Sequence, residues 1–211
     1  MMLASACMVL AGVLGLRLDA IREGNEQRET QWNLLLVNSE HPLPENYATS
    51  VDLLRLSNGE QVDERIYPAL QQMFDEARGD GIDLFVRSGF RPRSAQETLF
   101  DQKVQEFLNQ GYSEEDAVKE ASGWVARPGC SEHETGLAVD INANNYHNTQ
   151  ETFAWLMANS WRYGFVQRYP TDKAAITGTY NEEWHYRYVG LEAAKTMHER
   201  RQCLEEYLGV R

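Results

Sequence analysis

The stretch SEHETGLAVD, residues 131–140, places an imidazole and a carboxylate at the two ends of an apolar segment. His133 stands near its start, Asp140 follows seven residues later, and the run at residues 136–141 predicts a short buried strand. A carboxylate that emerges from the interior without a partner is strongly unfavourable. A divalent metal shared with His133 and a third ligand would stabilise it. The stretch EEWH, residues 182–185, supplies a further imidazole at His185.

Two imidazoles and one carboxylate would leave the fourth position of a zinc ion open for water, as in catalytic rather than structural zinc sites. A nearby free carboxylate can then serve as general base. His133 and Glu134 also begin like the helical motif His-Glu-x-x-His, but residue 137 is leucine, which excludes that family. Spacing alone leaves two explanations open, a metal site or a pair of ordinary core or surface histidines.

The rest of the chain alternates between helical and strand patterns. Apolar residues recur at helical spacing over residues 62–77, where Pro68 either kinks the helix or marks a later start. Short apolar segments predict strands at residues 82–86, 136–141 and 186–189, and helical patterns cover residues 94–108, 113–125, 149–160 and 191–208. Because no internal repeat interrupts this order, we expect one compact α+β domain.

The N-terminal segment differs in kind from the rest. Residues 1–16 carry no charge, and we interpret residues 1–18 as an apolar signal segment or signal anchor, followed by a polar spacer at residues 19–31 and the catalytic domain at residues 32–211. The apolar run is shorter than the roughly 20 residues that span a bilayer, and basic residues follow rather than precede it. We favour a retained anchor; an ordinary apolar helix is the alternative.

Charge and cysteine content exclude some classes of function. The formal net charge of −12 opposes binding to nucleic-acid phosphates, so DNA and RNA are not expected partners. Cys7, Cys130 and Cys203 are too far apart in the sequence to form a cysteine metal motif. In an exported protein Cys130 and Cys203 could form a disulfide, and two free buried thiols explain the sequence equally well.

The two stretches that carry the histidines resemble a known pair of signatures. Ser-x-His-x-x-Gly-x-Ala-x-Asp at residues 131–140 and Glu-x-Trp-His at residues 182–185 are similar to those of the D-Ala-D-Ala metallopeptidases, in the lysostaphin and sonic hedgehog superfamily. Further matches follow in VanY-like order: SGFR at 88–91, Gln96, ARPG at 126–129, GF at 164–165, RYP at 168–170, ITG at 176–178 and YRYVG at 186–190. The resemblance covers roughly residues 33–208. It implies a small central antiparallel sheet that carries the zinc site and is flanked by helices.

The resemblance also implies roles for individual residues. His133, Asp140 and His185 would be the zinc ligands, and Glu182 the general base. Arg91 would stand beside the scissile carbonyl, where its fork of donors can stabilise the oxyanion or hold the substrate.

The same resemblance suggests contacts to the substrate. Ser131, Gln96 and Ser88 are the candidates for binding the peptide, although Ser131 could instead cap or brace the loop before His133. Three other histidines, His41, His147 and His198, match no motif position, and we interpret them as non-ligands.

Two arguments disagree about which glutamate is the base. In a regular strand, side-chain alternation would place Glu183 on the face of His185. The family correspondence instead favours Glu182, which requires a turn or bulge ahead of the strand. Relatives often carry proline where this chain has Glu183, and proline cannot accept a proton. We therefore predict Glu182.

The resemblance implies a zinc-dependent D-alanyl-D-alanine carboxypeptidase that acts on peptidoglycan stem peptides. One alternative is an L,D-carboxypeptidase that cuts tetrapeptide stems, and another is a zinc-stabilised binding module without activity. We expect a monomer in the extracytoplasmic cell envelope, held at the cytoplasmic membrane by its N-terminal segment.

Overall fold

The computed structural model describes residues 31–144 and 149–210. The chain divides after Leu35 into two units, and the described part of the first holds the 3-10 turn η1 (Trp32–Leu34). The apolar segment predicted at residues 1–18 lies outside the described residues. Within residues 31–144 and 149–210, no helix is both long and apolar enough to span a bilayer.

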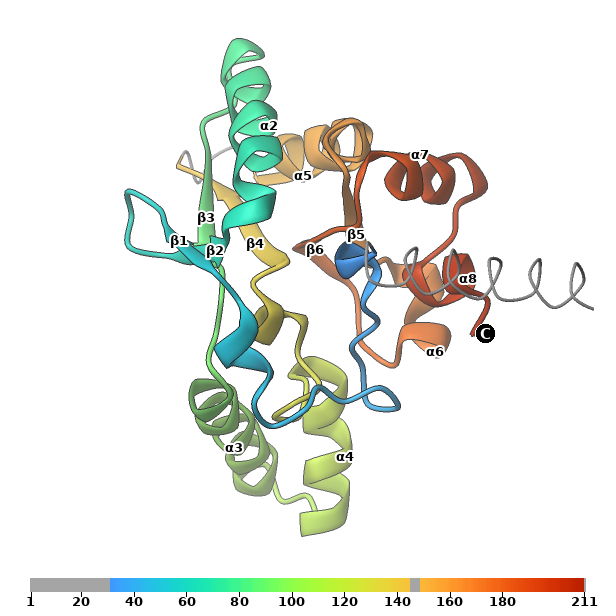
Figure 1. Ribbon diagram of the computed structural model, residues 1–211. Helices are drawn as coiled ribbons and strands as arrows, with labels where there is room; N and C mark the ends of the chain where they lie inside the picture. The colour runs from blue at the N-terminus through green and yellow to red at the C-terminus, as the bar shows by residue number, and fades with distance from the viewer. Residues whose placement is uncertain (1–30, 145–148, 211) are drawn as a thin grey trace, which may run out of the picture. The chain divides into compact units, whose positions relative to one another are not determined.

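A four-stranded antiparallel sheet forms the centre of the second unit (Figure 1). Its strands are β3 (Leu84–Ser88), β4 (Ala138–Ala143), β6 (Glu182–Tyr188) and β5 (Phe165–Tyr169), in that spatial order. A separate antiparallel hairpin joins β1 (Leu53–Arg55) to β2 (Gln61–Asp63). The α+β class and the small antiparallel sheet are confirmed.

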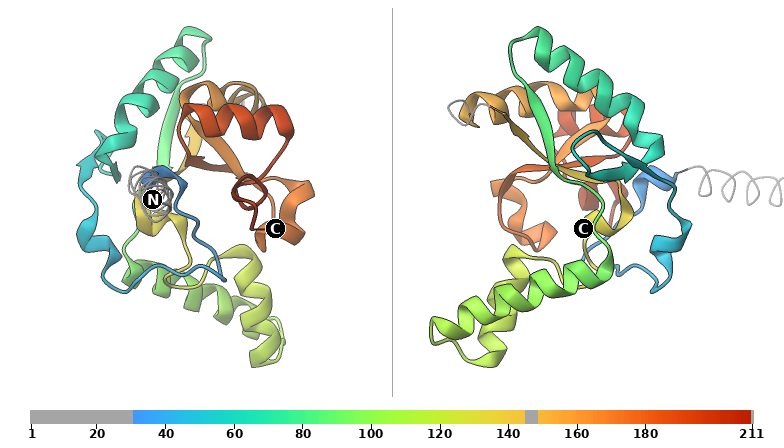
Figure 2. Two further views of the ribbon diagram at one scale, coloured as in Figure 1. Left: turned by 45° about the vertical axis from the view of Figure 1, so that its right-hand side comes forward. Right: turned by 90° about the vertical axis from the view of Figure 1, so that its left-hand side faces the viewer.

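Helices and 3-10 turns surround the sheet. The helices are α2 (Tyr67–Gly79), α3 (Arg93–Asn109), α4 (Glu114–Trp124), α5 (Thr149–Asn159), α6 (Ala174–Thr177), α7 (Leu191–Arg200) and α8 (Leu204–Leu208). The 3-10 turns of this unit are η2 (Tyr47–Ser50), η3 (Glu64–Ile66), η4 (Glu132–Thr135), η6 (Ser160–Tyr163) and η7 (Thr171–Lys173). Helices α2, α5 and α7 pack against β3, β4 and β5 respectively, while α3 and α4 lie side by side below the sheet in both views of Figure 2.

One face of the sheet is part of the apolar core. Val86 lies opposite Ile141, and Val139 lies opposite Tyr186; all four side chains are buried. Removing an aliphatic side chain of this size from water stabilises the fold by about 1.5–3 kcal/mol. Helices α2 and α5 pack against β3 and β4. Burial against these helices explains why the two strands are rich in apolar residues that favour β-structure.

The other face of the sheet carries polar side chains. Asp140 lies directly opposite His185, and Ala138 lies opposite Arg187. Directly paired residues of antiparallel strands project to the same side. The strand register therefore brings Asp140 and His185 together, although 44 other residues separate them in the sequence.

Several elements differ from those expected from the sequence. Residues 61–63 form β2, and α2 begins at Tyr67 with Pro68 in its first turn, where the missing N–H of proline is tolerated. Strand β5 and the β1–β2 hairpin are additional, because three-residue strands and a strand containing Arg168 give no clear apolar alternation. The single predicted helix at 191–208 is wrong: Arg201, at φ 53°, separates α7 from α8.

Candidate metal centre

His133 is presented by the short turn η4, which two glycines make possible. Gly136 ends the turn with φ +72°, and a Cβ there would come within 2.8 Å of the Asp63 backbone nitrogen. Gly89 lies so close to β2 that a Cβ would meet the Gln61 carbonyl oxygen at 2.1 Å. The Gly89 carbonyl oxygen lies 2.8 Å from Nδ1 of His133. It accepts the Nδ1 proton, which leaves the Nε2 lone pair free to face Asp140.

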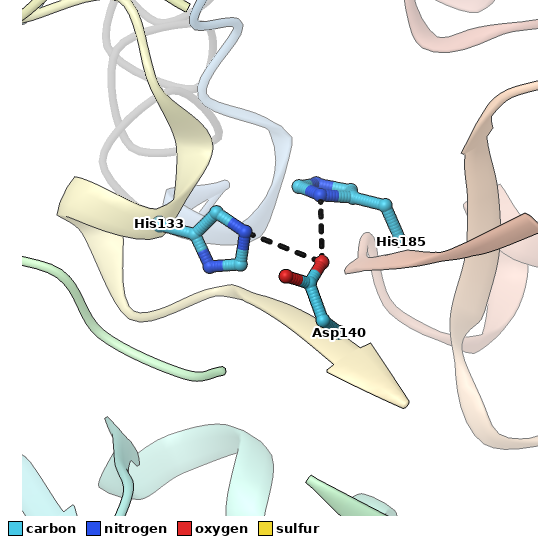
Figure 3. Close-up of side chains that lie close together, drawn as sticks. All are labelled: His133, Asp140 and His185. Carbon is cyan, nitrogen blue, oxygen red and sulfur yellow. Dashed lines mark ion pairs between the residues drawn. The ribbon is translucent and has the colours of Figure 1, made fainter. Parts of the chain in front are cut away.

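His133, Asp140 and His185 converge on one point, as Figure 3 shows. Oδ1 of Asp140 lies 3.3 Å from Nε2 of His133 and 3.2 Å from Nδ1 of His185, and the three potential donor atoms all lie within 4.8 Å of one another. Donors around a tetrahedral zinc with bonds of about 2.0–2.2 Å are themselves about 3.3–3.6 Å apart. Two of the three donor pairs therefore lie close to the spacing around a shared zinc ion, and the third is no wider than 4.8 Å.

The electrostatics of these three groups also fit a cation. Burial opposes ionisation of Asp140, but His133 and His185 together hold the pKa of Asp140 well below its usual range. Burial lowers the pKa of His133, which favours the neutral ring that a metal needs. Burial also disfavours charge on His185, but the nearby carboxylates of Asp140 and Glu132 raise the pKa of His185 to about 9, so in the metal-free site this ring carries the positive charge that a bound metal ion would replace. Oδ1 of Asp140 has no hydrogen-bond partner among the described residues, which leaves it available to a metal.

Glu182 lies beside this cluster because β6 is irregular at its start. Between Gln167 and Tyr169 the partner on β6 moves from Tyr186 to Glu182, so β6 advances four residues where β5 advances two. Oε2 of Glu182 lies 3.3 Å from Nδ1 of His185. Burial raises the pKa of Glu182 to about 7, despite the opposing effect of His185. Glu183 is exposed.

Arg91 is held by hydrogen bonds from both sides. Its Nη1 donates to Oε1 of Gln96 at 2.9 Å, and its Nη2 donates to Oγ of Ser88 at 2.8 Å. The Arg91 backbone N–H donates to the carbonyl oxygen of His133 at 3.0 Å. Gln96 also donates to the Ala126 carbonyl oxygen at 2.6 Å and is buried. Ser88 and Gln96 therefore fix the guanidinium of Arg91.

A cavity of about 140 Å³ lies over the cluster. Its lining includes Arg91, Ser131 and Glu182 together with the three potential ligands. Three aromatic side chains at the same cavity or its edge are partly exposed: Trp124 and Trp184 line it, and the Tyr180 ring packs on Trp124 with centroids 4.9 Å apart. The predicted ligands, base, arginine and Ser131 thus share one open space.

Within residues 31–144 and 149–210, the other histidines and cysteines take no part in this cluster. Nδ1 of His41 lies 3.0 Å from Oδ1 of Asn38, and the ring of His198 stacks on Trp161 at 4.6 Å. His147 and Cys7 lie outside the described residues. Cys130 and Cys203 are free thiols, so the disulfide alternative is not observed.

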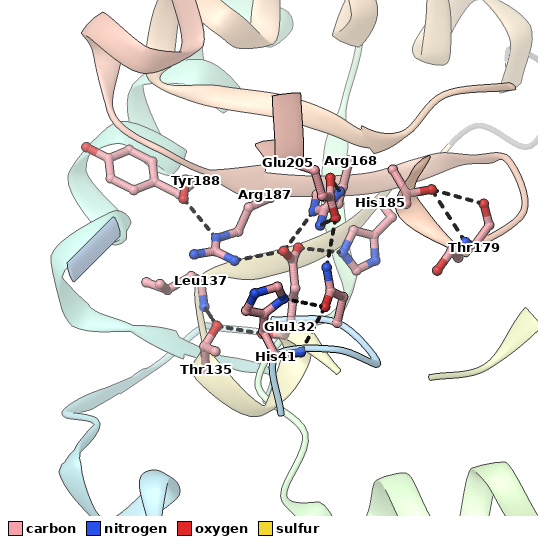
Figure 4. A network of polar contacts seen from close by, with 12 residues as sticks. His41, Glu132, Thr135, Leu137, Arg168, Thr179, His185, Arg187, Tyr188 and Glu205 are labelled. Atoms are coloured by element: carbon pink, nitrogen blue, oxygen red, sulfur yellow. Dashed lines mark hydrogen bonds and ion pairs between the residues drawn. The ribbon is translucent and has the colours of Figure 1, made fainter. Parts of the chain in front are cut away.

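One residue at the site has no counterpart among the sequence candidates. Glu132 follows Ser131 and precedes His133, it is buried, and its carboxylate faces Nε2 of His185 (Figure 4), whereas Asp140 faces Nδ1 of the same ring. A signal for it does exist in the sequence. Arg168 and Arg187 lie in strands, and buried arginines of this kind require buried carboxylate partners.

Comparisons with known proteins identify the family of this chain. The family model described as VanY, D-alanyl-D-alanine carboxypeptidase, matches residues 59–191. A D-alanyl-D-alanine carboxypeptidase of Enterococcus faecalis is 51% identical over 192 residues, which are 90% of this chain and 70% of the relative.

Solved structures give the same result. A mutant of the vancomycin resistance D,D-pentapeptidase VanY in complex with Zn(II) is 52% identical, with a TM-score of 0.80 over 84% of this chain and 99% of the other. VanYB in complex with D-alanine-D-alanine is 51% identical, with a TM-score of 0.81 over 84% and 98%. The chain therefore belongs to the VanY family of D-alanyl-D-alanine carboxypeptidases.

Proposed function

We propose that this protein is a zinc-dependent peptidase that hydrolyses the terminal D-alanine from peptidoglycan stem peptides. The observation that carries the proposal is the convergence of His133, Asp140 and His185 beside the carboxylate of Glu182, at the floor of a cavity. The Zn(II) and D-alanine-D-alanine complexes of related proteins support the metal and the substrate class.

In this proposal Nε2 of His133, a carboxylate oxygen of Asp140 and Nδ1 of His185 hold the zinc. The other ring nitrogen of His133 is already engaged with the Gly89 carbonyl oxygen, so only Nε2 faces the cluster. When bound, zinc supplies a Lewis acid that polarises a carbonyl and lowers the pKa of water.

Glu182 is the group that moves protons. Its Oε2 accepts a proton from the attacking water and delivers it to the nitrogen of the leaving D-alanine. In the metal-free site burial raises the pKa of Glu182 to about 7, which is close to the pH at which a general base is most effective. Glu183 is exposed, which supports Glu182 as the base.

Arg91 stabilises the negative charge that develops on the carbonyl oxygen. Ser88 and Gln96 hold its guanidinium in place before substrate arrives, and such preorganised donors lower the barrier most effectively. We therefore assign Ser88 and Gln96 to positioning Arg91 as well as to the edge of the substrate site. Ser131 lines the cavity and is the better candidate for a direct hydrogen bond to the peptide.

We further propose that the reaction takes place outside the cytoplasmic membrane. Residues 1–18 would hold the protein at that membrane, residues 19–31 would be the spacer, and residues 32–211 the peptidase domain. The uncharged run at residues 1–16 and the peptidoglycan substrate support this arrangement.

The deciding experiment supplies zinc-loaded protein with a pentapeptide stem ending in D-Ala-D-Ala and, separately, with the tetrapeptide stem. Mass spectrometry of the products should show loss of one alanine from the pentapeptide and no cleavage of the tetrapeptide. Cleavage of the tetrapeptide instead would assign L,D-carboxypeptidase activity. Absence of cleavage in both, together with unfolding on metal removal, would assign a zinc-stabilised binding module.

A further inference from the structure

Four charged side chains form a buried network directly behind the metal centre (Figure 4). We call Glu132, Arg168, Arg187 and Glu205 the buried quartet. Oε1 of Glu132 accepts from Nε of Arg168 at 2.8 Å and from Nη1 of Arg187 at 2.9 Å. Arg168 also donates from both terminal nitrogens to the two oxygens of Glu205, at 3.0 and 2.6 Å. Two carboxylates thus balance two guanidiniums.

Such a network is expensive to bury, and apolar side chains of similar volume often fill the space with equal or better stability. Its side chains are at most 1% exposed, so each charge depends on its partners in the protein. The quartet also lies on the polar face of the sheet, where Arg187 follows His185 by two residues. Its position suggests a task at the metal centre rather than a contribution to stability alone.

The two oxygens of Glu132 are used differently. Oε1 accepts hydrogen bonds from both guanidiniums, whereas Oε2 has no hydrogen-bond partner among the described residues. Oε2 faces Nε2 of His185 at 3.6 Å, and Nε2 likewise has no other partner within the described part of the chain. Nδ1 on the opposite edge of the same ring faces Asp140.

We propose that Glu132 is a positioning residue for the metal centre: its Oε2 accepts the Nε2 proton of His185, which directs Nδ1 of that ring to the metal. Histidine ligands of metals usually donate their second ring N–H to a carboxylate or carbonyl, which fixes the tautomer and the ring orientation. His133 has such a partner in Gly89, and Glu132 gives His185 the equivalent one. The inference rests on the zinc site proposed above. We expect the 3.6 Å separation to shorten to a hydrogen bond when zinc is bound.

Glu134 provides a matched control within the same turn. Like Glu132 it adjoins His133 in sequence, is buried and pairs with an arginine, since its Oε2 lies 3.0 Å from Nε of Arg93. Its Oε1 accepts from the Gly129 backbone N–H at 2.6 Å. Glu134 therefore supports the loop before Ser131, and within the described residues it makes no hydrogen bond or ion pair with His185. Loss of either carboxylate disturbs the turn η4, and only loss of Glu132 removes the partner of a ligand.

The test compares Glu132→Gln with Glu134→Gln, each measured by competition for zinc with a chelating dye and by thermal unfolding of the metal-free protein. We expect Glu132→Gln to weaken zinc binding by about 10–100-fold. Glu134→Gln should lower the unfolding temperature while its zinc affinity stays close to that of wild type. Equal zinc affinity for wild type and Glu132→Gln, or equal weakening in both variants, would overturn the inference.

A measurement on the unmodified protein covers the case in which Glu132→Gln does not fold. In zinc-loaded wild type, nitrogen-15 NMR should show His185 protonated at Nε2, with that proton shifted downfield by its carboxylate partner. An Nε2 proton at the position of an unbonded imidazole would overturn the inference. His133→Ala tests the site separately: if zinc binding survives in that variant, the proposed ligand set itself fails.

Discussion

Two glutamates flank the ring of His185 and differ in almost everything except residue type. Glu182 lies 3.3 Å from Nδ1 on the cavity side, and Glu132 lies 3.6 Å from Nε2 on the buried side. Burial raises the pKa of Glu182 to about 7. Burial acts in the same direction on Glu132, but Arg168 and Arg187 outweigh it and hold its pKa far below the usual range.

The number of fixed cations nearby therefore decides what each carboxylate can do. Glu132 stays ionised and does not take up a proton at neutral pH. It can therefore orient its neighbour but cannot act as a base. Within the described residues Glu182 has no ion pair with an arginine; Arg91 acts on it only at longer range, and Glu182 can gain and lose a proton. A base needs an adjustable charge, whereas a positioning group needs a permanent one.

The largest effect is expected from removing the adjustable charge. Glu182→Gln keeps the shape of the side chain but cannot accept a proton, so kcat/KM for the pentapeptide stem should fall by about 10²–10⁴-fold. Zinc affinity, measured by dye competition, should be retained. Activity close to that of wild type would show that another group accepts the proton.

A smaller loss of activity is expected when the arginine that would stabilise the oxyanion is removed. Arg91→Ala should leave the fold and zinc binding intact and lower kcat by on the order of a hundredfold or more, because one preorganised donor is lost. Arg87→Ala, in strand β3 four residues before Arg91 and exposed, is the control and should behave like wild type. If both variants retain full activity, Arg91 does not contact the developing charge.

The ionised carboxylates of the buried quartet should affect how the stability of the fold depends on pH. The pKa values of Glu132 and Glu205 are lowered from their ordinary 4.5: burial opposes this, but Arg168 outweighs it. Both carboxylates therefore stabilise the fold above about pH 4.5, and this stabilisation is lost as pH falls further. The unfolding temperature of metal-free protein should drop in that range.

Glu205→Gln sharpens this prediction. At neutral pH the variant should be less stable by about 3–5 kcal/mol, because Arg168 loses a buried partner, and its further loss of stability in acid should be shallower. Glu199→Gln, on the exposed side of α7, should follow the wild-type curve. Identical acid curves for Glu205→Gln and wild type would mean that the quartet does not contribute to acid unfolding.

The smallest effect is expected at the neighbouring glutamate. Glu183 is exposed, so Glu183→Gln should change kcat/KM for the pentapeptide stem by little. Pairing this variant with Glu182→Gln tests the strand irregularity directly. If Glu183→Gln were inactive and Glu182→Gln active, the regular alternation of side chains along the strand, and not the family correspondence, would identify the base.

The sequence predicts much of the site because its signals are local. The run around His133 and Asp140 contains both a buried strand and two polar groups, and the first signature includes the glycine that ends the η4 turn. The role of Glu132 is harder to predict. It depends on Arg168 and Arg187, which come from two other strands and meet Glu132 only after the sheet has formed.

The same limit applies to the fold. Helices α3 and α4 lie close to their predicted bounds, because capping and helical spacing act within a few residues. Strand β5 has no clear alternation, since Arg168 is buried by ion pairs rather than by apolar contacts. The shift in register at Glu182 also results from pairing between strands, which residue patterns along one strand do not record.

The left-handed residue Arg201 has a consequence for how this enzyme can be shortened. It ends α7 and turns the chain so that α8 brings Glu205 back to Arg168 and to Asn38. Truncation before Glu205 would leave the buried guanidinium of Arg168 with one of its two acidic partners, although no side chain in the cavity would be removed. The smallest working version of this peptidase therefore extends well past its last predicted ligand, His185.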